Sequence, residues 1–97
     1  MIFPVIYSER AIETFDAISE QIDQRWGMKH VFEFEYRTLK AIAAIKESPF
    51  IFQATESSPN VRKAFIHKNC AMFYEIKSDR IEILFFWDNR QDPIILY

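Results

Sequence analysis

The only glycine in the chain, Gly27, lies between two stretches of helical periodicity, and this arrangement constrains the fold more than any other feature. Before the glycine, apolar residues recur at steps of three or four, at Ile12, Phe15, Ile18, Ile22 and Trp26. Because glycine readily adopts the left-handed conformation in which many helices end, we expect the first helix to stop there. With only Gly27 and Met28 between the two patterns, a tight antiparallel helical hairpin is predicted.

The second helix is predicted from Lys29 to about Lys46. One apolar stripe on it consists of Val31, Phe34, Thr38, Ile42 and Ile45, and a second consists of Phe32, Tyr36, Leu39 and Ala43. Two apolar stripes predict two contacts, one with the first helix and one with a sheet. Pro49 ends this helix, because the residue before a proline is pushed out of the helical region.

The sequence on either side of the hairpin favours strands. Ile2 to Tyr7 is β-rich, and Pro4 within it lacks a backbone donor, which indicates an edge strand. Ser8 then supplies a hydroxyl that can cap the first helix. After a loop predicted from Pro49 to Asn60, three strands joined by two-residue turns are expected at Arg62 to His67, Cys70 to Lys77 and Arg80 to Trp87.

The last strand is predicted to be central in the sheet. Its alternation places Ile81, Ile83, Phe85 and Trp87 on one face and Glu82, Leu84 and Phe86 on the other, so both faces are apolar for part of its length. The whole order predicts a single α+β domain over residues 1–97, arranged β-α-α-β-β-β. In this fold a helical hairpin packs on a four-stranded, mainly antiparallel sheet.

Composition narrows the classes of function. A chain of 97 residues with 49% hydrophobic content suits one compact domain. Its net charge of -2 argues against nucleic-acid binding by bulk electrostatics, although a local basic patch is left open. A lone cysteine forms no intrachain disulfide, which fits a reducing interior. Because no window approaches the length of a membrane span and no charged leader is present, we expect a cytoplasmic protein without membrane contact.

Several chemistries are disfavoured by the residues present. One glycine excludes a phosphate-cradling loop and a dinucleotide fingerprint, and no GxSxG elbow occurs. His67 and Cys70 with the distant His30 could supply metal ligands, but a second pair with finger-like spacing is missing. Cys70 as a nucleophile would need exposure and a nearby base, whereas its place at a strand start indicates packing. We therefore expect neither a metal nor another cofactor.

Four short motifs, in this order, resemble the RelE/ParE superfamily of toxins from bacterial type II toxin–antitoxin modules. They are IYSERAIETF, VRKAF with Arg62, MFYEI with Tyr74, and ILFFWDNRQDP near the C-terminus. The resemblance covers nearly the whole chain. It implies a growth-arresting toxin that is neutralised by a cognate antitoxin, whose disordered segment folds over the hairpin and the sheet.

Two modes of action follow from the resemblance. Similarity to ParE-like members implies inhibition of DNA gyrase through protein contact, whereas similarity to RelE-like members implies cleavage of messenger RNA on the ribosome. Many superfamily members have a histidine and paired arginines after the last strand, where this chain has Trp87, Asp88, and Arg90 followed by Gln91. The smaller set of cations favours the gyrase hypothesis. An inactive relative that only binds antitoxin is a third hypothesis.

The resemblance also implies candidate site residues. If the protein is a nuclease, the catalytic residues are Arg62, His67 and Arg90, with Tyr74 or Tyr97 as the acid. Contacts with the target or the antitoxin are predicted at Lys63, Tyr74, Arg90, Ile94, Ile95, Leu96 and Tyr97. The last four are apolar or aromatic and costly to leave in water, at roughly 25 cal/mol per Å2, so they should pack on the sheet or under a partner.

Each candidate also has a structural interpretation. Arg62 could pair with a surface acid, and His67 could be a solvated turn residue. Tyr74 alternates with Met72 and Ile76, which favours core packing with a hydrogen-bonded hydroxyl. Arg90 could form a salt bridge with Asp88 or Asp92.

Overall fold

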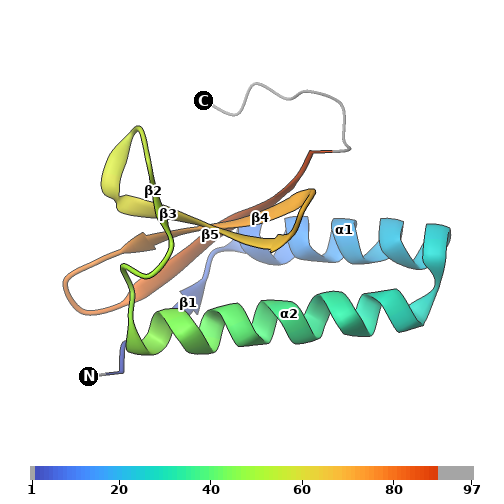
Figure 1. Cartoon of the computed structure of the whole chain (residues 1–97), viewed down its shortest axis with the longest axis horizontal. Helices are drawn as coiled ribbons and strands as arrows, with labels where there is room; N and C mark the ends of the chain where they lie inside the picture. The colour runs from blue at the N-terminus through green and yellow to red at the C-terminus, as the bar shows by residue number, and fades with distance from the viewer. Residues whose placement is uncertain (1, 90–97) are drawn as a thin grey trace.

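The computed structural model describes residues 2–89 of the chain. The elements are β1 (Val5–Tyr7), α1 (Glu9–Trp26), α2 (Met28–Glu47), β2 (Gln53–Thr55), β3 (Ser58–His67), β4 (Cys70–Ile76) and β5 (Ile81–Asp88). The two helices run side by side along one face of the sheet (Figure 1). This two-layer arrangement confirms the predicted α+β class and the helical hairpin packed on a sheet.

The sheet has one strand more than the sequence predicted. Its order is β1-β5-β4-β3-β2, with β1 parallel to β5 and the other pairs antiparallel. The fifth strand is β2, which lies inside the predicted loop and pairs with β3. A strand of three residues is too short to show an alternating pattern, so only its pairing reveals it. The edge position predicted for the N-terminal strand is confirmed.

Gly27 closes the hairpin as the sequence predicted. Its φ of 87° lies in the left-handed region, and its N–H donates to the carbonyl of Asp23 at 2.9 Å. A residue with a Cβ atom rarely adopts this φ, which explains why glycine stands at this position. α2 then begins at the next residue, Met28.

Only one of the two apolar stripes on α2 is buried. The buried residues of the helix are Val31, Phe34, Thr38, Ile42 and Ile45, which are the members of the first predicted stripe. Phe34 touches both α1 and the sheet, because its ring stacks on Phe15 of α1 at 4.9 Å and meets Phe86 of β5 at 6.3 Å. The prediction that the second stripe forms a separate contact is wrong for the described residues. Phe32, Tyr36 and Leu39 are 60%, 62% and 63% exposed.

A β-bulge in β5 also changes the predicted facing of its residues. Ile83 pairs with Tyr74 and Phe85 pairs with Phe73, so Leu84 is an extra residue in the ladder. Beyond it the alternation is reversed. Phe86 packs among the core aromatics with Ile81 and Ile83, whereas Phe85 stacks on Phe73 at 4.6 Å. The predicted grouping of Phe85 with Ile81 and Ile83 is therefore wrong, because simple alternation fails at an inserted residue.

Side chains of α1 and its cap bind the edge of β5 beyond the end of β1. The Ser8 hydroxyl accepts the N–H of Ala11 at 2.9 Å, as predicted for a helix cap, and donates to the carbonyl of Leu84 at 2.7 Å. The N–H of Phe86 donates to the Thr14 hydroxyl at 2.9 Å. Because these groups lie where no strand continues the ladder, α1 replaces the missing neighbour.

Candidate functional site

Arg62 is held by backbone carbonyls rather than by a surface acid. Its Nε donates to Pro59 at 2.8 Å, and its Nη1 donates to Phe50 at 3.3 Å and Phe52 at 2.9 Å. The guanidinium also lies 4.8 Å from the centre of the Phe50 ring. These contacts give Arg62 a structural role, which is to fasten the segment after α2 to the sheet. Its catalytic role stays a prediction.

Tyr74 lies in the core. Its side chain is 0% exposed, and its hydroxyl donates to the Pro49 carbonyl at 2.8 Å. Burial raises the pKa of Tyr74 to about 12, even though the nearby Arg62 charge acts in the opposite direction. The core-packing interpretation of Tyr74 with a hydrogen-bonded hydroxyl is therefore confirmed. Its contact with a target or antitoxin stays a prediction.

His67 and Lys63 do not gather around Arg62. Arg62 and His67 stand five positions apart on one strand, which corresponds to roughly 16 Å at the usual rise per residue. Lys63 is half-buried, and its Nζ lies 5.4 Å from the centre of the Phe65 ring. His67 instead lines a pocket with residues of the two helices. Of the predicted site residues within the described chain, Arg62 and Tyr74 are thus neighbours on β3 and β4, whereas His67 lies at the end of β3.

Five further predicted site residues lie outside the described residues. They are Arg90, Ile94, Ile95, Leu96 and Tyr97. Their predicted roles in binding, and that of Arg90 in catalysis, stay predictions. The residue before them, Asn89, donates its N–H to the carbonyl of Asn69.

The best candidate for a binding surface is a groove between the two helices. This hairpin groove has a volume of 430 Å3 and a floor formed by Phe15, Thr38, Ile42 and Phe86. Tyr7, Ile12 and Leu39 line its sides and are 47%, 54% and 63% exposed. Soluble proteins rarely leave a continuous apolar surface of this kind uncovered without a binding role.

The apolar surface continues from the groove along α2. Tyr36 and Phe32 follow Leu39 toward the start of the helix, at spacings of three and four residues. Among residues 2–89, the charged residues that line the groove itself are both acidic, Asp16 and Glu35. The residue-based predictions missed this surface, although its signal was present in the sequence as the second stripe of α2.

Two negative findings concern the described residues alone. No helix within residues 2–89 is long and apolar enough to cross a membrane. Over the same range, no group of three or more His, Cys, Asp or Glu side chains could hold a metal ion.

Comparison with known proteins identifies the fold. No family model matches the sequence, and no curated protein matches it significantly. A chain of the chromosomal ParDE TA system from P. aeruginosa superposes with a TM-score of 0.75 at 14% identity, covering 90% of this chain and 96% of that chain. The YoeB dimer from Staphylococcus aureus gives a TM-score of 0.64 at 10% identity, covering 90% and 97%. The chain therefore has the RelE/ParE-type fold that its motifs predicted.

Proposed function

We propose that this protein is the toxin of a type II toxin–antitoxin pair, and that a segment of its antitoxin binds in the hairpin groove. The observation that carries the proposal is an uncovered apolar groove on a fold shared, over 90% of the chain, with a component of a ParDE TA system. A disordered segment that folds on binding gains stability by covering such a surface.

The chemistry of the groove specifies the kind of segment that fits it. The exposed side chains of Ile12, Leu39 and Tyr7 would be buried by apolar side chains at helical spacing in the partner. Asp16 and Glu35 call for lysine or arginine beside those apolar residues, because opposite charges at an interface improve specificity and the rate of association. The proposed occupant is therefore an amphipathic helix with basic flanks.

Substitution of Leu39 tests the binding surface. Leu39→Glu places a charge against the partner's apolar side chains and beside Glu35, so we expect antitoxin affinity to fall by tenfold or more, since burying a leucine contributes about 1.5–3 kcal/mol. The measurement is titration of the purified toxin with the protein encoded by the neighbouring gene. The matched control is Ile51→Glu, at a site 57% exposed and outside the groove. An equal loss in both variants would refute the groove as the binding site.

For the cellular target, we favour DNA gyrase, inhibited through protein contact. His67 lies five residues from Arg62 along β3, and the Arg62 guanidinium already binds three carbonyls. A nuclease that relies on acid–base chemistry needs its charged groups around one phosphate. The arrangement of the described cations therefore supports the non-catalytic mode.

Two assays distinguish the modes of action. Under the gyrase hypothesis, purified protein added to a supercoiling reaction should trap cleaved DNA. Under the ribosomal hypothesis, primer extension on messenger RNA from arrested cells should show new 5′ ends. An inactive relative would give neither result and would still bind antitoxin. If Arg90→Ala leaves growth arrest unchanged, Arg90 is not part of the site.

A further inference from the structure

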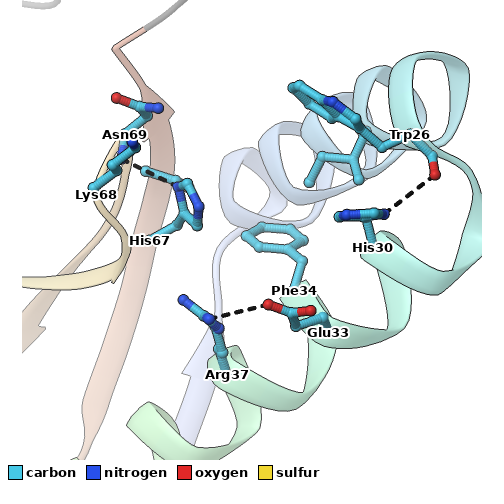
Figure 2. Close-up of a pocket in the computed structure, with 10 residues that line it drawn as sticks. Trp26, His30, Glu33, Phe34, Arg37, His67, Lys68 and Asn69 are labelled. Carbon is cyan, nitrogen blue, oxygen red and sulfur yellow. Dashed lines mark hydrogen bonds and ion pairs between the residues drawn. The ribbon is translucent and has the colours of Figure 1, made fainter.

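A second pocket lies between the β3–β4 turn and the closed end of the helical hairpin (Figure 2). This turn pocket has a volume of 420 Å3, within the range of roughly 300–1,000 Å3 typical of small-molecule sites. The helices contribute Trp26, His30 and Arg37, and the turn contributes His67, Lys68 and Asn69. None of these residues lines the hairpin groove, so the two sites are separate.

The interior of the turn pocket is apolar and aromatic. Ile22, Phe34 and Cys70 are 8%, 5% and 2% exposed and form its floor. Trp26 is 46% exposed at the end of α1, and its ring centre lies 6.3 Å from that of His30 in the first turn of α2. A large exposed indole beside an apolar floor suits a flat aromatic ligand, because stacking on such a ring depends little on the ligand's identity.

The rim of the turn pocket carries more positive than negative charge. Arg37 and Lys68 are cationic, and Glu33 is the acidic residue among the described residues that line the pocket. Glu33 accepts a hydrogen bond from Arg37 at 3.0 Å. The Lys68 charge on the turn is therefore in excess, in a chain whose net charge is -2. An anionic group is the ligand feature that this rim favours.

Backbone hydrogen bonds fix the two imidazole rings. Nδ1 of His67 accepts the N–H of Asn69 at 3.4 Å, so the proton of the neutral ring is on Nε2, which is a donor. Nδ1 of His30 lies 3.2 Å from the Trp26 carbonyl, which only accepts, so that nitrogen carries the proton and Nε2 is an acceptor. Figure 2 shows the two rings on opposite sides of Phe34. The pocket thus presents ordered polar groups above an aromatic floor.

We infer that the turn pocket binds a nucleotide. The base lies against Trp26 above Phe34, and the phosphate meets Lys68 on the β3–β4 turn. The base and phosphate can come from a free mononucleotide or from the end of a single RNA strand. The inference does not depend on the proposed toxin function, because no residue of the hairpin groove takes part.

Titration followed by NMR tests the inference. We expect adenosine 5′-monophosphate to shift the indole N–H signal of Trp26 and the amide signals of His30 and Asn69, and to do so saturably. Adenosine alone and inorganic phosphate alone should each bind at least about tenfold more weakly than the mononucleotide, because each retains only one half of the contacts. A tetra-adenylate that binds more tightly than the mononucleotide identifies RNA as the source, and the reverse order identifies a free nucleotide.

Exposed residues supply matched variants. Lys68→Ala removes the cation of the turn and should weaken binding by about tenfold or more, the factor expected when a charge-assisted hydrogen bond is lost. Lys40→Ala is the control, because Lys40 is exposed on α2 beside Tyr36 and does not line the pocket. An absence of saturable shifts at millimolar nucleotide, or equal weakening by both substitutions, would overturn the inference. Neither result would affect antitoxin binding or gyrase inhibition, which are measured separately.

Discussion

At the scale of single residues, two cross-strand neighbours hold the chain where it leaves α2. Arg62 and Tyr74 are register partners on β3 and β4. Arg62 binds the carbonyls of Phe50 and Phe52, and Tyr74 binds the carbonyl of Pro49. The family motifs that singled out these two residues therefore coincide with a structural contact. A substitution of either residue therefore changes the stability of the fold, and its effect on activity must be compared with its effect on folding.

The Tyr74 hydroxyl should contribute measurably to stability. Tyr74→Phe leaves the buried Pro49 carbonyl without this donor, and we expect the free energy of unfolding to fall by about 1–3 kcal/mol. Urea denaturation followed by circular dichroism measures it. Tyr36→Phe is the control, because that side chain is 62% exposed, and its stability should match the wild type. Unchanged stability in the Tyr74 variant would show that the buried bond contributes nothing.

The same hydroxyl should make the stability of the protein depend on pH in the alkaline range. Burial raises the pKa of Tyr74 to about 12 from 10.0, so between these values the folded chain keeps a proton that the unfolded chain releases. Stability therefore falls as the pH rises through this window. Urea denaturation at pH 9 to 12 should show a smaller decline for Tyr74→Phe than for the wild type. Parallel declines would mean that other groups cause the loss.

At the scale of elements, α1 is bound to β5 by side-chain hydrogen bonds as well as by apolar contact. Ser8 binds the carbonyl of the bulge residue Leu84, and Thr14 binds the N–H of Phe86, two residues beyond it. Both backbone groups belong to the part of β5 that β1 is too short to cover. The start of α1 thus satisfies backbone groups of β5 at and beyond the bulge.

Removal of the Thr14 hydroxyl should weaken this junction. Thr14→Val keeps the shape of the side chain and leaves the N–H of Phe86 without its partner, so we expect a loss of about 1–3 kcal/mol in unfolding free energy. Thermal and urea denaturation measure the change. Thr55→Val is the control, since its hydroxyl bonds to the exposed Ser57 and its loss should cost less than about 0.5 kcal/mol. Equal effects at both sites would contradict the assigned role.

At the scale of the whole molecule, one core joins the two layers. The rings of Phe15, Phe34 and Phe86 come from α1, α2 and β5 and lie within 4.9 to 6.3 Å of one another. The hairpin is therefore not an independent unit, since its buried stripe is completed by the sheet. The exposed apolar stripe of α2 is not covered by either layer of the described structure.

A shared core predicts a single cooperative unfolding transition. We expect far-ultraviolet circular dichroism, which reports the helices, and near-ultraviolet circular dichroism, which reports the aromatic core, to change together with urea. Two separated midpoints would show that the hairpin and the sheet unfold independently. They would also contradict the packing of Phe34 against both layers.

The sequence by itself determined the helical hairpin and the order of the long strands along the chain. These features follow from local physics, since a periodic apolar face and a lone glycine leave few alternatives for Ser8 to Glu47. The tertiary structure alone decided the fifth strand, the bulge at Leu84 and the pairing of β1 with β5. It also placed Arg62 beside Tyr74 and away from His67, and it left the stripe containing Leu39 exposed. Strand pairing and shared burial depend on residues distant in the chain, and a local pattern does not record which partners will meet.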